Sequence, residues 1–252
     1  MNALRERWRS GRPAFGAWLS IPSSLAAEAV AHEGFDYVCI DLQHGMIDYP
    51  VATEMLLAIH SARSLPIVRV PSNDFAAINR MLDAGALGIV VPMIETPDDV
   101  RAAVAACRYP PAGSRSFGPN RAAFVAGLST SDYAATANDA VLCIPMLETV
   151  GALAALDEIA GIAGVDALYV GPYDLSLALG QPPGPDNPAP YQDAYRRIAS
   201  SCARAGIAAG IHANAELGAK HVATGYRMIT VSSDLGALSR GTAADLRRAR
   251  SD

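Results

Sequence analysis

Apolar, strand-like runs alternate with helical patterns eight times along this chain of 252 residues. The predicted strands are Ala14–Leu19, Tyr37–Asp41, Ile67–Val70, Gly88–Val91, Leu142–Leu147, Ala167–Val170, Ala208–Ile211 and Met228–Val231. The predicted helices are Leu25–Glu33, Tyr49–Ala62, Phe75–Ala84, Pro97–Cys107, Val150–Ile159, Tyr191–Ala205, Glu216–Thr224 and Leu235–Arg250. Glycines between a helix and the next strand, such as Gly85 and Gly206, are typical of helix C-caps. Eight such units in about 250 residues predict an α/β fold, a TIM (β/α)8 barrel.

The length suits one barrel, so residues 1–252 are expected to form a single domain. An open doubly wound sheet is the alternative, but no glycine-rich phosphate-binding motif follows the first strand. Two stretches interrupt the alternation, Tyr109–Ala140 and Gly180–Pro190, and both are expected to be irregular. Because both follow strand ends, each is either a wall of a site or a surface connection.

Composition excludes several classes of function. The net charge of −5 and the near absence of basic clusters argue against nucleic acid or an anionic membrane as partner. No apolar run approaches the ~18 residues of a membrane-spanning helix, and residues 1–12 lack the apolar core of a signal peptide. The chain is therefore expected to be cytoplasmic. The cysteines lie apart without metal-binding spacing, which is typical of reduced core residues: Cys39, Cys107, Cys143 and Cys202.

Two acids, Glu148 and Asp174, each come just after a predicted strand. The two strands are consecutive and joined by one helical crossover, so parallel pairing places both acids at the same end of the sheet. Either acid alone is also suited to a helix N-terminus. As a pair they favour a hard divalent cation, Mg²⁺ or Mn²⁺, with Co²⁺ as a further option, and with water and substrate completing the coordination shell. Zinc is disfavoured because the predicted strand ends do not offer a set of three histidines as ligands.

Other polar residues follow further strands. Arg69 ends an apolar strand, where its guanidinium is either half of a structural ion pair or a recognition group for a carboxylate or enolate oxygen. His44 lies three residues after Asp41, and a carboxylate beside an imidazole orients it as a general base. Asp83, at the unfavourable C-terminal end of a helix, is either a partner of His44 or exposed to solvent. His212 follows the seventh strand.

The lysine content separates two ways of stabilising a carbanion next to a carbonyl group. A Schiff-base aldolase needs a lysine that projects from a barrel strand into an apolar pocket. This chain has a single lysine among its 20 basic residues, Lys220, and it lies in the middle of a predicted helix. Imine chemistry is therefore not expected, and a metal ion must polarise the carbonyl instead.

Seven sequence blocks together identify a family. They are Phe35-Asp36-Tyr37 leading to Asp41 and His44, Val68-Arg69, Leu82-Asp83-Ala84-Gly85, Val91-Pro92-Met93, Arg108-Tyr109-Pro110-Pro111-Ala112-Gly113-Ser114-Arg115, Glu148-Thr149, and Val170-Gly171-Pro172-Tyr173-Asp174-Leu175-Ser176. Over almost its whole length the chain resembles the metal-dependent pyruvate aldolases of the HpcH/HpaI type. This family is typified by 4-hydroxy-2-oxo-heptanedioate aldolase and the 2-keto-3-deoxy sugar-acid aldolases.

The resemblance implies a TIM barrel that holds a divalent metal on Glu148 and Asp174 and requires no nucleotide. It implies reversible cleavage of a 4-hydroxy-2-oxo acid to an aldehyde and pyruvate, or a close analogue such as hydroxypyruvate, through a metal-stabilised enolate. Arg69 is then expected at the keto or enolate oxygen, and His44, with Asp41 or Asp83, is expected to move the hydroxyl proton. The expected substrate contacts are Arg69, Met146, Gly171, Pro172, Tyr173, Asp174 and His212. The resemblance also suggests a homohexamer in which the last helix is exchanged between neighbours.

Two positions depart from the family pattern. Relatives usually carry glutamine two residues before the metal-binding glutamate, where this chain has Met146, and a thioether cannot donate a hydrogen bond. Weaker pyruvate binding, or a different nucleophile such as hydroxypyruvate, is the expected consequence. His212 lies near positions where relatives have apolar residues lining the aldehyde pocket, so the acceptor is also expected to differ.

Three functions stay open at this point. The first is the aldolase. The second is a lyase of CoA thioesters, as in the related citrate-lyase β-subunit barrels, although no basic patch for nucleotide phosphates is evident. The third is a noncatalytic keto-acid-binding barrel, for which Met146 is the one indication.

Overall fold

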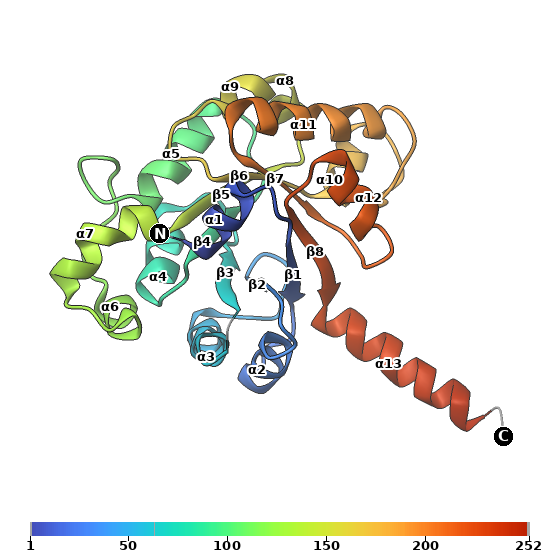
Figure 1. Cartoon of the computed structure of the whole chain (residues 1–252), viewed down its shortest axis with the longest axis horizontal. Coiled ribbons are helices and arrows are strands. Elements are labelled where there is room, and N and C mark those ends of the chain that lie inside the picture. Colours follow the sequence, from blue (N-terminus) through green and yellow to red (C-terminus); the bar gives the residue numbers. More distant parts are fainter. Residues whose placement is uncertain (1, 63, 251–252) are drawn as a thin grey trace.

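The computed structural model describes residues 2–62 and 64–250, and its strands close into a parallel barrel (Figure 1). The strands follow chain order around the barrel, and β8 pairs with β1. They are β1 (Ala14–Leu19), β2 (Tyr37–Asp41), β3 (Leu65–Arg69), β4 (Gly88–Val91), β5 (Leu142–Leu147), β6 (Ala167–Val170), β7 (Ala208–His212) and β8 (Met228–Ser233). The predicted TIM (β/α)8 barrel is confirmed.

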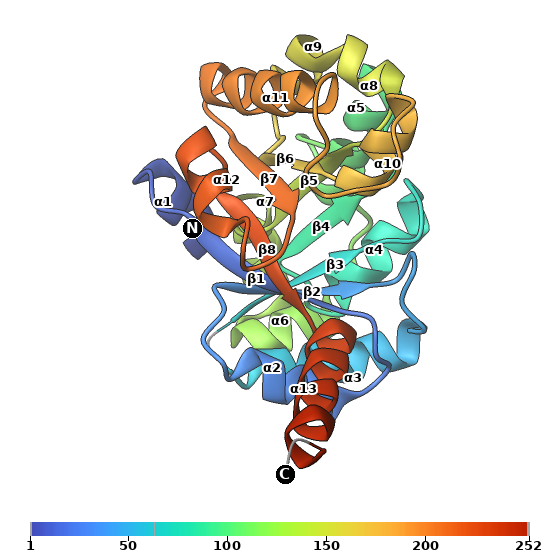
Figure 2. The same ribbon diagram turned by 90° about the vertical axis from the view of Figure 1, so that its right-hand side faces the viewer.

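Helices surround this barrel and cover most of its outer face (Figures 1 and 2). They are α1 (Ala3–Arg9), α2 (Ser24–Ala31), α3 (Tyr49–His60), α4 (Phe75–Asp83), α5 (Pro97–Cys107), α6 (Asn120–Ala126), α7 (Thr130–Ala140), α8 (Val150–Ala154), α9 (Leu156–Ala160), α10 (Pro172–Ala178), α11 (Tyr191–Ala205), α12 (Gly218–Thr224) and α13 (Asp234–Ala249).

The helices differ from the predictions in several places, and the short helices α1 and α10 were not predicted. The single helix expected over residues 150–159 is two short helices, which meet at Ala155. The stretch from 109 to 140, expected to be irregular, contains α6 and α7. Helix α6 ends at Gly127, which has a left-handed backbone, and α7 begins after Ser129, whose side chain is its N-cap. Their buried faces consist mainly of alanine. Hydrophobic periodicity depends on large apolar residues, so these helices carried little signal.

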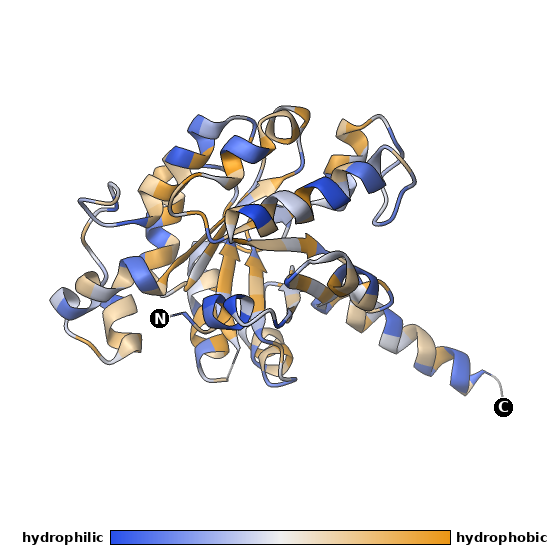
Figure 3. Ribbon diagram, turned by 45° about the horizontal axis from the view of Figure 1, so that its top comes forward, coloured by the Kyte–Doolittle hydropathy of each residue, from blue (hydrophilic) through white to orange (hydrophobic). Residues whose placement is uncertain are grey.

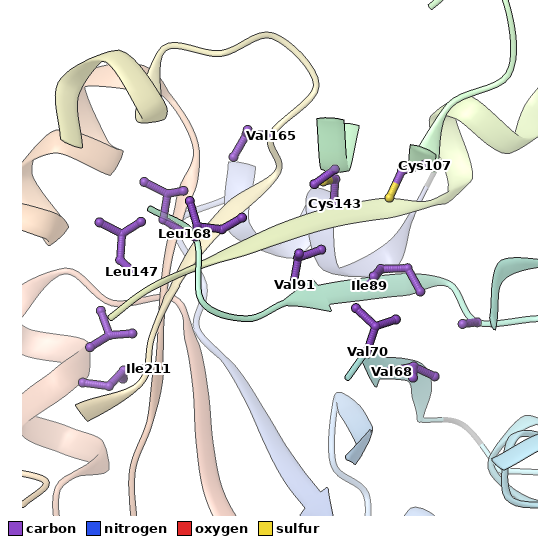
Figure 4. Packing of buried hydrophobic residues seen from close by; sticks show 14 of the residues in the cluster. Val68, Val70, Ile89, Val91, Cys107, Cys143, Leu147, Val165, Leu168 and Ile211 are labelled. Carbon is purple, nitrogen blue, oxygen red and sulfur yellow. The ribbon is translucent and has the colours of Figure 1, made fainter. Parts of the chain in front are cut away.

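Side chains along each strand alternate between the barrel interior and the surrounding helices, as the period of two requires. In β5, Leu142, Ile144 and Met146 belong to the interior cluster, whereas Cys143 and Leu147 belong to the outer layer. Figure 4 shows part of this outer layer, with labelled apolar side chains from β3 to β7 and with Cys107 of α5 close to Cys143. The four cysteines are free and buried, as predicted.

Two tyrosines and a threonine fill the middle of the barrel. The hydroxyl groups of Tyr37 and Tyr169 both hydrogen-bond to Oγ1 of Thr230, at 2.9 and 2.6 Å. Gly16 makes room for one ring, because a Cβ there would lie 2.2 Å from the ring of Tyr37. Gly210 does the same for Tyr169, at 2.6 Å. This layer is a packed floor, so any cavity must open above it.

The two ends of the chain have different relations to the barrel. Leu4 and Trp8 of α1 join the interior cluster, so α1 closes the N-terminal end of the barrel. By contrast, α13 extends away from the barrel (Figures 1 and 2), and Asp234 is its one buried residue. Figure 3 shows apolar strands at the centre of the molecule and a mixture of polar and apolar residues along α13.

Across residues 2–62 and 64–250, none of the helices combines the length and apolar character needed to cross a membrane. The cytoplasmic location stays a prediction.

Candidate active site

A cavity of about 300 Å³ opens at the C-terminal end of the barrel. Four strands contribute side chains to its lining: Trp18 of β1, Arg69 of β3, Tyr169 of β6 and His212 of β7. The other lining residues are His44, Met146, Glu148, Gly171, Pro172, Tyr173 and Asp174. The cavity therefore gathers most of the predicted site residues, in the place where barrel enzymes hold their substrates.

A second cavity, of about 450 Å³, lies at the opposite end, between α1 and the starts of β6 to β8. Its one acid, Asp166, is bound by Arg5 and Arg108 at 2.6 and 2.9 Å. Its carboxylate is already neutralised, so this cavity offers no free acid for chemistry.

Glu148 continues the inward row of β5 and is 2% exposed. Its Oε1 accepts a hydrogen bond from the backbone N–H of Met93 at 2.8 Å. Its Oε2 is buried and has no hydrogen-bond partner among the described residues. Burial raises the pKa of Glu148 above its usual value; the Met93 N–H opposes this, and the charge of Asp174 raises the pKa further.

Asp174 lies in the first turn of α10, next to the cavity, and is exposed. No side chain caps the N-terminus of α10, so the alternative role of Asp174 as a helix cap is not seen. Gly171 brings the two acids together. A Cβ on this residue would lie 2.2 Å from Oε2 of Glu148, so only glycine leaves space for the carboxylate.

Arg69 and Asp41 form a buried bidentate ion pair. Nε and Nη2 of Arg69 donate to the two carboxylate oxygens of Asp41 at 2.8 and 2.6 Å. Burial alone would raise the pKa of Asp41, but the hydrogen bonds and charge of Arg69 outweigh it and lower this pKa. The second terminal nitrogen of Arg69, Nη1, takes no part in the pair. Arg69 is thus both an ion-pair partner and a cation at the cavity.

The two acids expected beside the His44 ring have other partners in this chain. Asp41 accepts hydrogen bonds from the backbone N–H groups of Gln43 and His44, not from the imidazole. Asp83 is half of an ion pair with Arg115, at 2.9 Å. Neither acid lines the cavity. The expected role of Asp41 or Asp83 in orienting the ring stays a prediction, and His44 itself is exposed at the cavity.

His212 and Trp18 form the wall of the cavity next to Arg69. Their rings meet edge to face, with centroids 5.2 Å apart, and the guanidinium of Arg69 lies 5.0 Å from the Trp18 ring. Burial, together with the charge of Arg69, lowers the pKa of His212 to about 4. His212 is therefore neutral at physiological pH and presents one donor and one acceptor nitrogen.

The donor set fits a hard divalent cation. The partnerless Oε2 of Glu148 is a buried anionic oxygen, which is costly to leave unpaired, and the nearby charge of Asp174 adds repulsion that a cation would reverse. Among residues 2–62 and 64–250 no group of three or more His, Cys, Asp or Glu is suited to hold a metal. Two carboxylates with water and substrate suit Mg²⁺-like ions rather than zinc.

Sequence reasoning missed Trp18 and Tyr169 as lining residues, and the backbone of Met93 as a partner of Glu148. For Trp18 a signal was present, because it lies near the C-terminal end of its strand, as Arg69 does. No sequence signal identifies a backbone N–H as a hydrogen-bond donor.

The fold and this site define an enzyme of the (β/α)8-barrel class with its active site above the strand C-termini. Residues 14–240 match the HpcH/HpaI aldolase/citrate lyase family, to which this chain belongs. The family depends in general on a divalent metal and acts on small keto acids and aldehydes. The chain is an aldolase, a carbon–carbon lyase.

Named relatives span nearly all of the chain. The hydroxypyruvate/pyruvate aldolase of Rhizorhabdus wittichii is 39% identical over 241 residues, 95% of each chain. The 4-hydroxy-2-oxo-heptane-1,7-dioate aldolase of Klebsiella pneumoniae is 37% identical, covering 96% of this chain and 92% of its own. A solved HpcH/HpaI family protein of Burkholderia cenocepacia superposes with a TM-score of 0.91 at 38% identity, covering 99% of this chain and 100% of its own.

Proposed function

We propose that this enzyme cleaves a 4-hydroxy-2-oxo acid reversibly to an aldehyde and pyruvate, or hydroxypyruvate. The observation that carries the proposal is the partnerless, buried Oε2 of Glu148 beside Asp174, in a cavity that also presents the guanidinium of Arg69. The relatives named hydroxypyruvate/pyruvate aldolase and 4-hydroxy-2-oxo-heptane-1,7-dioate aldolase support this substrate class.

In this proposal Glu148 and Asp174 hold the metal, which is Mg²⁺ or Mn²⁺, with Co²⁺ as a substitute. When bound, the cation supplies Lewis-acid polarisation of the keto acid's oxygens. Gly171 leaves room for Oε2 of Glu148, since any side chain there would displace the carboxylate. Gly171, Pro172 and Tyr173 form the part of the wall next to Asp174 and contact the keto acid.

Arg69 stabilises the negative charge that develops on the keto oxygen. Its ion pair with Asp41 fixes the plane of the guanidinium and leaves Nη1 to donate to the substrate. Asp41 therefore acts as a positioning residue for Arg69, not as a partner of the His44 ring.

His44 is the proton-transfer group. It lines the cavity and is exposed, so its imidazole can reach the 4-hydroxyl group directly or through a water molecule. In carbon–carbon cleavage the hydroxyl proton moves to His44 while the electrons of the broken bond remain on the keto-acid fragment.

Met146 and His212 set the substrate preference. Met146 is 2% exposed and lines the cavity, where its thioether offers the keto acid no hydrogen bond. We infer that hydroxypyruvate, whose hydroxyl group adds a binding contact, competes well with pyruvate as the nucleophile. The neutral His212 favours aldehydes with a hydrogen-bonding group.

The alternative, a CoA-thioester lyase, has less support. Solved citrate lyase-type structures are 19% and 16% identical to this chain, which shows the fold alone. Turnover of free 4-hydroxy-2-oxo acids without CoA would exclude this alternative, and metal-dependent proton exchange at the methyl group of pyruvate would exclude a noncatalytic binding protein.

We also propose that the chain assembles into a homohexamer with α13 exchanged between neighbours. The support is the extended position of α13 and its exposed apolar residues, Leu235, Leu238 and Leu246.

The central experiment follows pyruvate or hydroxypyruvate release from a panel of 4-hydroxy-2-oxo acids, with and without added Mg²⁺, Mn²⁺ or Co²⁺. We expect EDTA to abolish release reversibly, and Glu148→Gln or Asp174→Asn to abolish it while circular dichroism shows a retained fold. Glu158→Gln, which changes an exposed acid, is the matched control. Full turnover in chelated protein would overturn the metal assignment.

A further inference from the structure

Met93 has an unusual backbone. It lies two residues beyond the end of β4 and has a φ of +53°, the one positive φ of a non-glycine residue within residues 2–62 and 64–250. Such a conformation is strained for a residue with a side chain. The Met93 side chain is 56% exposed and contributes little packing. Packing of the side chain therefore does not explain the strained backbone of Met93. The strained conformation instead sets the direction of the Met93 N–H group.

That N–H group points at Glu148. It donates to Oε1 at 2.8 Å, while Oε2 of the same carboxylate stays without a partner. A hydrogen bond from a fixed amide to a buried carboxylate is strong and directional. It fixes Oε1, so that Oε2 is the carboxylate oxygen left without a hydrogen-bond partner among the described residues.

Thr149 ties the Met93 segment to the loop that carries Glu148. Its hydroxyl donates to the backbone oxygen of Ile94 at 2.8 Å. As the N-cap of α8, Oγ1 of Thr149 also accepts a hydrogen bond from the N–H of Ala152 at 3.1 Å. Both Thr149 and Ile94 are buried. Gly151 keeps the two loops in contact, since a Cβ there would lie 2.7 Å from the backbone oxygen of Glu95.

We propose that Thr149 and the backbone N–H of Met93 are positioning elements for the metal-binding carboxylate of Glu148. The Thr149 hydroxyl holds the 92–96 loop, the loop holds Met93 in its left-handed conformation, and the Met93 N–H holds Oε1 so that Oε2 faces the cation. Groups that orient a metal ligand raise metal affinity, because they supply the orientation before the metal binds. This inference rests on the proposed function, in which Glu148 is a metal ligand.

The test measures Mn²⁺ binding to the metal-free protein by isothermal titration calorimetry, without substrate or turnover. Glu148→Gln first shows whether the measured site is the proposed one. Thr149→Val keeps the shape of the side chain but removes the hydroxyl, and we expect it to weaken Mn²⁺ binding by about 10-fold or more. Thr149→Ser restores the hydroxyl and should restore the affinity. Gly151→Ala, which pushes the two loops apart, should weaken binding as Thr149→Val does.

One control separates positioning from stability. Ser129→Ala removes an equivalent N-cap from α7, away from the cavity, and should lower the melting temperature without changing Mn²⁺ affinity.

The outcomes are distinct. Wild-type Mn²⁺ affinity in Thr149→Val, together with loss of binding in Glu148→Gln, would show that Thr149 is only a helix cap and would overturn the inference. Wild-type Mn²⁺ binding in Glu148→Gln would reject the proposed metal site, and with it this inference.

Discussion

In the proposed mechanism Arg69 serves two anions. Two of its nitrogens bind Asp41, and the third is proposed to bind the substrate, a division that needs the planar fork of a guanidinium. Asp41 is 2% exposed, so its charge depends on this partner. A point charge such as ammonium cannot make the bidentate pair and also reach a second acceptor.

We therefore predict that Arg69→Lys lowers kcat by about 10²–10³, the usual effect of losing a charged donor at a developing oxyanion. Lysine keeps a positive charge beside Asp41, which makes it a cleaner variant than alanine. Steady-state kinetics of pyruvate release are the measurement, with the exposed Arg101→Lys as the control. Wild-type kinetics in Arg69→Lys would reduce Arg69 to a structural ion-pair partner.

At His44 the prediction separates proton transfer from metal binding. His44→Ala should slow retro-aldol cleavage by about 10²–10⁴, which is typical of the loss of general acid–base catalysis. Mn²⁺ affinity, measured by calorimetry on the same protein, should stay unchanged because His44 is not a proposed ligand. The opposite pattern, lost Mn²⁺ binding with normal cleavage at saturating metal, would make His44 a ligand and require another base.

At the scale of elements, α11 and α12 meet around a buried histidine. His221 of α12 is 1% exposed, and its Nδ1 lies 2.7 Å from the hydroxyl of Tyr195 on α11. Burial, with the nearby charge of Lys220, lowers the pKa of His221 to about 4, from 6.5. In the window between these values the unfolded chain binds a proton that the folded chain does not, so the free energy of unfolding falls as the pH falls.

We predict that His221 contributes a loss of stability on going from pH 7 to pH 5, with an upper limit of about 1.4 kcal/mol for each pH unit below its unfolded-state pKa. In His221→Gln this pH-dependent loss should be smaller, even though the variant is less stable at pH 7. Urea unfolding at both pH values measures the difference. The exposed His32→Gln is the control. An unchanged pH dependence in His221→Gln would show that His221 titrates normally.

At the scale of the whole molecule, α13 is the helix that extends away from the barrel instead of packing on it. Its first residue, Asp234, accepts hydrogen bonds from the backbone N–H groups of Ser20 and Ile21, which anchors the start of the helix. Beyond it, Leu235, Leu238 and Leu246 are 58%, 57% and 51% exposed and share one face by their helical spacing. A helix of 16 residues has little stability without packing, so this face is suited to a second copy of the chain.

We predict that the double substitution Leu235→Asp and Leu238→Asp converts the assembly into smaller species, because it places charge on an apolar contact. Light scattering coupled to size-exclusion chromatography measures the mass. Ser200→Asp, on the exposed side of α11, controls for added charge. A monomeric wild type, or an unchanged mass in the double variant, would contradict the exchange of α13.

The sequence by itself determined the barrel and the end of it that holds the site. The alternation of strand and helix patterns and the period of two within strands are local properties, readable from neighbouring residues. They predicted that Glu148, Asp174, Arg69 and His44 would meet at one end, and all four line one cavity. Where local signal was weak, as in the alanine-rich α6 and α7, the prediction failed.

Only the tertiary structure decided which groups are partners. The register of β2 and β3 places Asp41 directly beside Arg69, although Asp41 is closer to His44 in sequence. Asp83 pairs with Arg115, 32 residues away, and the N–H of Met93 reaches Glu148 across 55 residues. Such pairs depend on strand register and on the path of loops between distant segments. A hydrogen bond or ion pair requires the two groups to approach within a few ångströms, and residue types and local spacing do not specify that distance.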